Sequence, residues 1–134
     1  MEILFAGRSA LYVVTAAYLA FGLWFALTDY TLNDEGLLTH YWAKWAWLDF
    51  VPVFFFQKIK PPLAVLYAPF AALGVHATMV AHTVVAAAAL PMIAATARAL
   101  EQRLPNLPAF IVAFSPIYFF GGSSGISNTD GVVA

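Results

Sequence analysis

Residues 61–97 read PPLAVLYAPFAALGVHATMVAHTVVAAAALPMIAATA and contain no Asp, Glu, Lys or Arg. A helix needs about 20 apolar residues to cross the roughly 30 Å hydrocarbon core of a bilayer. A water-soluble chain of 134 residues would have to bury this whole segment in its interior. Alanine, threonine and histidine are interspersed along it, and small and hydroxyl side chains are typical of helices that pack together in membranes. The stretch therefore predicts a membrane-embedded helix with helical neighbours.

The composition of the whole chain supports the same interpretation. Hydrophobic residues make up 63% of it, charged residues only 10%, and the mean hydropathy is +0.81, whereas soluble domains carry about 25% charged residues. We expect an all-α integral membrane protein with three to four transmembrane or re-entrant helices. Residues 1–120 form its single domain, and residues 121–134 are a polar, extended tail. The net charge of −1 argues against a nucleic-acid partner, and the lack of cysteine excludes disulfides and thiolate metal sites.

Five segments can be placed on this plan. Ala10 to Thr28 is a clear span. Leu37 to Gln57 is a second one, whose amphipathic first half could lie in the interface before the chain turns inward, with a kink at Pro52. A single helix over residues 61–97 would be about 55 Å long, which exceeds the bilayer core. We therefore divide it into a short interfacial or re-entrant piece, Leu63 to Leu73, and a true span, Gly74 to Ala97. Ala109 to Phe120 is short for a full crossing and is a fourth span, a hairpin arm or a surface helix.

Little in the sequence points to catalysis by this chain alone, because the familiar phosphate-binding, nucleophile and zinc-protease motifs are missing. The candidate cofactor ligands are its three histidines, His40, His76 and His82. His76 and His82 lie about 120° apart on one helix, so they cannot hold one metal from one face. A pair between His40 and either of them stays open, as does a single haem ligand completed by a partner. The alternative for His82 is a hydrogen bond to Thr78, four residues earlier.

The segment Leu37 to Gln57 also concentrates polar and aromatic side chains. Asp49 lies near the headgroups, or pairs with Lys44 or a partner's arginine, or serves as a proton-relay or ligand-binding carboxylate. Trp42, Trp45 and Trp47 could frame a flat hydrophobic ligand such as a quinone, sterol or pigment. Aromatic residues of this kind more often form an interfacial belt and helix contacts, which is the interpretation we favour.

One short string at the end of the first span, GLWFALTDY at residues 22–30, is more specific. It resembles the end of the haem-bearing helix in the small membrane-anchor subunit of succinate dehydrogenase, respiratory complex II, where a glycine is followed by hydrophobic-Thr-Asp-Tyr at the same offset. The resemblance implies that Tyr30 hydrogen-bonds a quinone carbonyl, with Asp29 beside it at the membrane surface. In that family the haem-ligating histidine falls four residues before the glycine, where this chain has Tyr18. Haem b shared with a partner stays a candidate cofactor, with His76 and His82 as its candidate ligands.

A second string of features is similar to the four-helix sterol-isomerase and sigma-2-receptor-like membrane proteins. They are Asp29, Asp49, His76 and the Ser115–Pro116 pair, each at a comparable place in its helix. This similarity implies a stand-alone four-helix bundle that binds a lipid or sterol.

We expect, first, a non-catalytic subunit of a larger electron-transport complex of the respiratory chain, a divergent complex II anchor that contributes to a quinone site. Other membrane subunits and lipids would be its partners, in the mitochondrial or bacterial inner membrane. The alternatives are the lipid- or sterol-binding bundle, an accessory subunit of a photosynthetic complex, and a membrane enzyme that borrows its cofactor.

Overall fold

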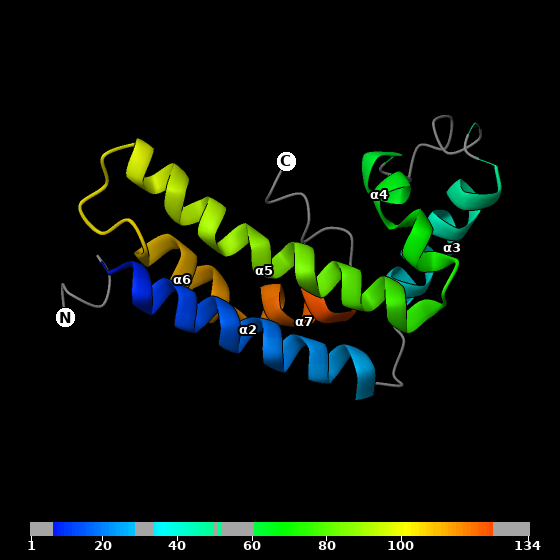
Figure 1. Cartoon of the computed structure of the whole chain (residues 1–134), viewed down its shortest axis with the longest axis horizontal. Coiled ribbons are helices and arrows are strands. Elements are labelled where there is room, and N and C mark those ends of the chain that lie inside the picture. Colours follow the sequence, from blue (N-terminus) through cyan, green and yellow to red (C-terminus); the bar gives the residue numbers. More distant parts are fainter. Residues whose placement is uncertain (1–6, 29–33, 50, 52–60, 125–134) are drawn as a thin grey trace.

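The computed structural model describes residues 7–28, 34–49, 51 and 61–124, and all regular structure in these residues is helical. The helices are α2 (Arg8–Thr28), α3 (Asp34–Leu48), α4 (Pro61–Ala71), α5 (Val75–Ala99), α6 (Leu107–Ala113) and α7 (Pro116–Ser124) (Figure 1). The all-α prediction is therefore confirmed for the described part of the chain. Residues 125–134 of the predicted tail lie outside it, but residues 121–124 belong to α7, which corrects the predicted start of the tail.

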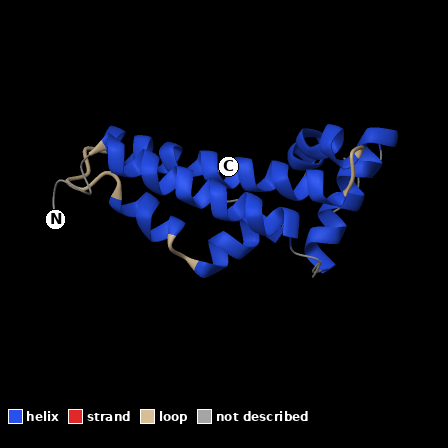
Figure 2. Ribbon diagram, turned by 60° about the horizontal axis from the view of Figure 1, so that its bottom comes forward, coloured by secondary structure: helices blue, strands red, loops and turns tan. Residues whose placement is uncertain are grey.

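Helices α2 and α5 lie side by side and run in opposite directions, with α6 and α7 alongside them (Figures 1 and 2). With 21 and 25 residues, both are long and apolar enough to cross a membrane by length and composition. At 1.5 Å per residue, α2 is about 31 Å long, close to the thickness of a hydrocarbon core. They correspond to the two spans predicted over Ala10 to Thr28 and Gly74 to Ala97.

Two interruptions divide the rest of the bundle. Gly74 separates α4 from α5 with a φ of 117°, a left-handed conformation that favours glycine. The short piece predicted over Leu63 to Leu73 is accordingly a separate helix, α4. Between α6 and α7 the helix is interrupted around Ser115, because Pro116 has no N–H to continue the helical hydrogen bonds.

Helices α3 and α4 form a hairpin that packs on the first turns of α5, at one end of the bundle (Figure 1). The predicted span over Leu37 to Gln57 differs from this arrangement. Helix α3 has 15 residues and ends at Leu48, so it is about 22 Å long and too short to cross a bilayer core. Residues 52–60 lie outside the described part of the chain.

Small side chains bring the helices close together. The main core contains Leu11 and Tyr18 of α2, Phe110 of α6, Tyr118 of α7 and a row of α5 residues that includes Ala86, Ala87, Leu90 and Ala94. A methyl group added at Gly22 of α2 would lie 2.6 Å from Thr83 Cγ2 of α5. The α2–α5 contact thus requires glycine at this position. Alanine plays the same part in the hairpin, where Ala43, Ala46, Ala64 and Ala68 are buried.

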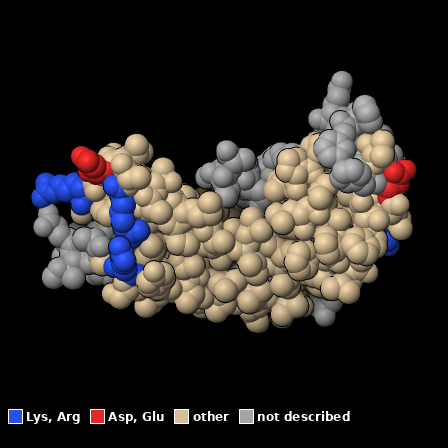
Figure 3. Space-filling model, turned by 45° about the horizontal axis from the view of Figure 1, so that its top comes forward, with Lys and Arg blue, Asp and Glu red and all other residues tan. Residues whose placement is uncertain are grey.

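Among the described residues, the Lys, Arg, Asp and Glu side chains visible in Figure 3 lie at the two ends of the bundle. Arg8 begins α2, while Arg98 and Arg103 lie at the end of α5 and just beyond it. Lys44 and Asp49 belong to the α3 end.

Candidate ligand groove and buried histidines

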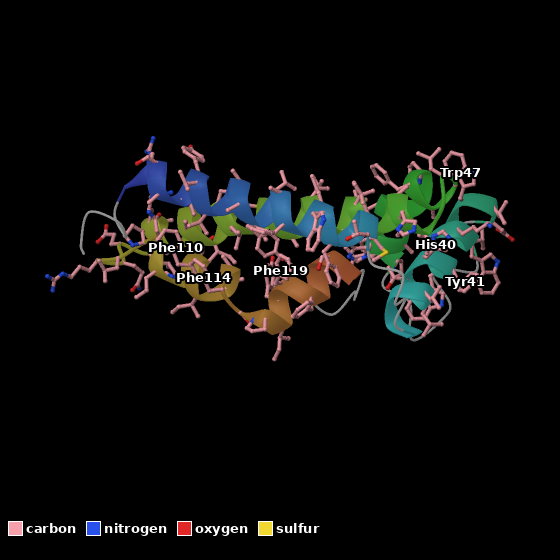
Figure 4. All side chains as sticks on the ribbon, turned by 90° about the horizontal axis from the view of Figure 1, so that it is seen from below. His40, Tyr41, Trp47, Phe110, Phe114 and Phe119 are labelled. Carbon is pink, nitrogen blue, oxygen red and sulfur yellow. The ribbon has the colours of Figure 1, made fainter. Side chains whose placement is uncertain are left out.

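An apolar groove of about 610 Å³ runs between α2 and the broken pair α6–α7. It is larger than two other surface cavities of about 420 Å³ each. Its lining consists of aliphatic and aromatic side chains, namely Val13, Val14, Ala17, Tyr18, Phe21, Trp24 and Phe25 from one side and Ala113, Phe114, Phe119 and Phe120 from the other. Figure 4 shows Phe114 and Phe119 on either side of the helix break. The groove therefore lies halfway along α2, away from both charged ends.

Tyr18 lines this groove and is 5% exposed. Its hydroxyl donates a hydrogen bond to the carbonyl oxygen of Tyr118, at 3.2 Å, and the Tyr118 hydroxyl donates to the carbonyl oxygen of Ala86, at 3.0 Å. These two bonds connect α2, α7 and α5. The phenolic oxygens are thus engaged within the bundle, while the aromatic ring of Tyr18 contributes apolar surface to the groove.

Aromatic contacts shape the wall that α7 contributes. Phe119 meets the Tyr18 ring edge-on, with centroids 5.5 Å apart, and Phe25 packs between Phe119 and Phe120 at 6.3 and 5.6 Å. Carboxylates, imidazoles and amines are missing from the lining, so the groove offers dispersion and stacking rather than acid–base chemistry. It suits a flat ring or a hydrocarbon chain.

The buried histidine of the hairpin, His40, contacts α5 through a hydrogen-bond chain. Its Nδ1 lies 3.0 Å from Thr78 Oγ1, and the Thr78 hydroxyl donates to the carbonyl oxygen of Gly74 at 3.3 Å. Since the hydroxyl proton is used there, Nδ1–H of His40 is the donor to Thr78. Burial, followed by the positive charge of Lys44, lowers the pKa of His40 below its ordinary value of 6.5. His40 is therefore neutral at pH 7. Thr78 forms its hydrogen bond with His40, and not with His82 as the sequence predicted.

His76 and His82 contact different helices. Nδ1–H of His76 donates to the carbonyl oxygen of Ala26 at 2.9 Å, which ties the start of α5 to the end of α2. His82 is fully buried, and its ring stacks on Tyr67 of α4 with centroids 4.0 Å apart and planes at 24°.

The surroundings of His82 do not fit a haem. A porphyrin needs open space in front of the ligating nitrogen, whereas the ring of His82 is enclosed and covered by Tyr67. The three cavities described above have no histidine in their linings. Within the described residues, no group of three His, Asp or Glu side chains could hold a metal ion. The enclosed ring of His82 therefore does not fit the predicted haem, while a haem ligand at the half-buried His76 stays a prediction.

The remaining residues considered in the sequence analysis are Asp29, Tyr30 and Asp49. Asp29 and Tyr30, the predicted quinone contacts, lie outside the described residues. Asp49 is exposed after the end of α3, where its Oδ1 accepts a hydrogen bond from the N–H of Val51 at 3.3 Å. It forms a local turn contact at the surface, which agrees with a place near headgroups.

Sequence reasoning missed the groove. The α2 side was visible as residues at helical spacing, Val13, Ala17, Phe21 and Trp24, but these are also typical of any apolar helix face.

The fold and the groove define a small all-helical bundle with two helices of membrane-spanning length. No family model, curated protein or solved structure matches the chain. The resemblance to complex II anchors accordingly stays a prediction.

Proposed function

We propose that this protein is an integral membrane subunit without catalytic activity of its own, which holds a quinone-type molecule in the groove beside α2. The groove is the observation that carries this proposal, because it combines a large apolar volume with aromatic walls at mid-depth of a helix of membrane-spanning length. Small-molecule sites in proteins are concave and mainly apolar.

Insertion in a bilayer is supported by the outer surface of α2. Large apolar side chains cover it, with exposed fractions of 63% for Tyr12, 68% for Val13, 64% for Phe21, 64% for Trp24 and 57% for Leu27. So many large, exposed apolar side chains along one helix are unusual on a soluble monomer. Residues 107–124, which include α6 and α7, would reach about 27 Å as a helical path. We accordingly place α2, α5 and the α6–α7 pair across the membrane, with the charged ends at its two surfaces.

The chemistry of the groove suggests which part of the quinone it holds. Two lining side chains can donate a hydrogen bond: the Tyr18 hydroxyl, which already donates to Tyr118, and the indole N–H of Trp24 in the last turns of α2. The rest of the lining is aliphatic or phenyl and offers no donor. An isoprenoid tail needs no donor, whereas quinone carbonyls do. We therefore assign the tail to the groove, and contacts to the carbonyls remain the separate proposal for Tyr30 and Asp29.

Since the lining has no carboxylate, imidazole or amine, electron and proton transfer would come from partner subunits. This supports the role of a subunit in an electron-transport complex of the mitochondrial or bacterial inner membrane. The same lining also accommodates an acyl chain, which favours the stand-alone lipid-binding bundle as the second candidate.

Trp24 provides a direct test of the groove, because the other three tryptophans are all in α3. The full chain carrying Phe at positions 42, 45 and 47 is reconstituted in phosphatidylcholine nanodiscs, and Trp24 fluorescence is recorded during titration with an isoprenoid quinone. Saturable quenching is expected. Ala17→Phe, which fills the groove, should weaken the apparent affinity at least tenfold, whereas Ala16→Phe on the same helix but outside the lining should not. Linear, unsaturable quenching that is the same in both variants would contradict quinone binding here.

Assembly is tested separately by native electrophoresis of gently solubilised membranes and mass spectrometry of the band that holds this chain. Co-migration with flavoprotein and iron–sulfur subunits would support the complex II role. Migration as a monomer or dimer would remove the subunit proposal and leave the lipid-binding bundle.

A further inference from the structure

The outer face of α3 carries a pattern that neither the fold nor the groove explains. Its inner face is buried through Thr39, His40, Ala43 and Ala46, which are 0–8% exposed and lie against α4 and α5. The remaining surface of the helix is therefore turned outward.

On that outward surface, Tyr41, Lys44, Trp45 and Leu48 follow the i, i+3, i+4, i+7 spacing of one helical stripe. Tyr41 is 59% exposed, Trp45 39% and Leu48 75%. Together with Trp42 they wall a shallow pocket of about 420 Å³ around Lys44. We call these five residues the α3 stripe.

The composition of the α3 stripe indicates its depth in a membrane. Tryptophan and tyrosine concentrate at the level of the headgroups, where the ring is in an apolar setting and its polar atom reaches water. A lysine at the bilayer centre costs about 2.5–3.5 kcal/mol on insertion scales, whereas near the surface its stem lies along apolar groups and its ammonium reaches the headgroups. The position of the hairpin at one end of α2 and α5 agrees with this depth (Figures 1 and 4).

Charge complementarity then selects the occupant. Lys44 is the one cation among the described residues of α3 and α4, and α4 contains no carboxylate. The nearest carboxylate after it in the sequence, Asp49, accepts a hydrogen bond from the Val51 N–H at 3.3 Å. An ammonium beside aromatic rings and an exposed leucine matches a molecule with an anionic phosphate and a hydrocarbon chain.

We propose that the α3 stripe lies in the headgroup layer of the adjacent leaflet and binds an anionic phospholipid, with the phosphate at Lys44 and the start of an acyl chain against Trp45 and Leu48. This site is separate from the groove. It rests on the membrane insertion proposed above but not on quinone binding.

The test uses the full chain with Trp24→Phe, so that the three tryptophans of α3 report alone. The protein is reconstituted in phosphatidylcholine nanodiscs that contain either brominated phosphatidylglycerol or brominated phosphatidylcholine at the same mole fraction. Quenching should be stronger with bromine near the headgroup end of the chain than near its terminus. Phosphatidylglycerol should be enriched around α3 by about fivefold relative to phosphatidylcholine, the factor expected for one basic residue near the surface.

Lys44→Gln should remove the preference for the anionic lipid, and Lys44→Arg should keep it. Arg103→Gln, which removes a cation at the opposite end of the bundle, serves as the matched control and should keep it as well. Two results would overturn the lipid site while leaving membrane insertion intact. One is equal quenching by both lipids when the α3 stripe is unsubstituted, and the other is a preference for phosphatidylglycerol that persists in Lys44→Gln. The absence of quenching by either lipid would instead overturn both the site and the insertion on which it rests.

Discussion

Gly22→Ala is the substitution whose effect can be worked out most fully from the structure. The new Cβ would lie 2.6 Å from Thr83 Cγ2 but 3.9 Å from the Thr83 Cβ and Oγ1. The clash is therefore with a single methyl group. Overpacking of this kind costs about 1–3 kcal/mol, while alanine gains up to about 1 kcal/mol over glycine in a helix. We expect Gly22→Ala to lower the free energy of unfolding by about 1 kcal/mol.

Thr83→Ser provides the decisive second variant, because it removes the methyl group and keeps the hydroxyl that donates to the Met79 carbonyl at 2.9 Å. Alone it should cost about 1 kcal/mol for the lost buried methyl. On the Thr83→Ser background, Gly22→Ala should become stabilising, so the sign of its effect reverses. Denaturant unfolding in detergent, followed by circular dichroism, measures all four proteins of the cycle. An effect of Gly22→Ala that is equally destabilising on both backgrounds would refute the proposed close contact of α2 and α5.

Three further outcomes are expected. Tyr118→Phe should lower the free energy of unfolding by about 1–2 kcal/mol in the same assay, because the Ala86 carbonyl loses its hydroxyl donor. Asn106→Ala should loosen the basic end, since the Asn106 side chain accepts from Arg98 at 2.7 Å and donates to the Gly7 carbonyl at 2.8 Å; hydrogen exchange of residues near the start of α2 should increase. The lowered pKa of His40 means that the folded state binds fewer protons than the unfolded state. Stability should accordingly be full above pH 6.5 and fall as the pH drops below it, and His40→Gln should remove that part of the pH dependence of unfolding.

The helical spans of the bundle could be predicted because their signals are local. Over thirty uncharged residues, with Gly74 to interrupt them, are enough to define α4 and α5. Leu37 to Gln57 was harder to place, because aromatic residues are typical both of interfacial helices and of span ends. The structure ends α3 at Leu48, and residues 52–57 lie outside the described part of the chain. The predicted tail began at the Gly121–Gly122 pair. A methyl group at Gly122 would lie 2.7 Å from the Ala86 Cβ, so this glycine permits helix packing rather than ending α7.

The groove could not be predicted because it depends on contacts between distant parts of the chain. Tyr18, which lines it, donates a hydrogen bond to the carbonyl oxygen of Tyr118, 100 residues away in sequence. The spacing of α2 residues identifies an apolar face, but the same face could meet a helix, a lipid or a ligand. Only the break at Ser115–Pro116, and the direction it gives to α7, leaves part of that face uncovered.

The position of α7 indicates that the groove exists before a ligand arrives. Tyr118 fixes α7 to α5 through the Ala86 carbonyl and to α2 through Tyr18. Gly122 holds the same helix against both neighbours at a distance that no larger residue allows. Since these contacts lie behind the wall and not inside the groove, a bound chain can enter without breaking them. Binding therefore should not require ordering of α7, which reduces the entropy cost that a flexible site would impose.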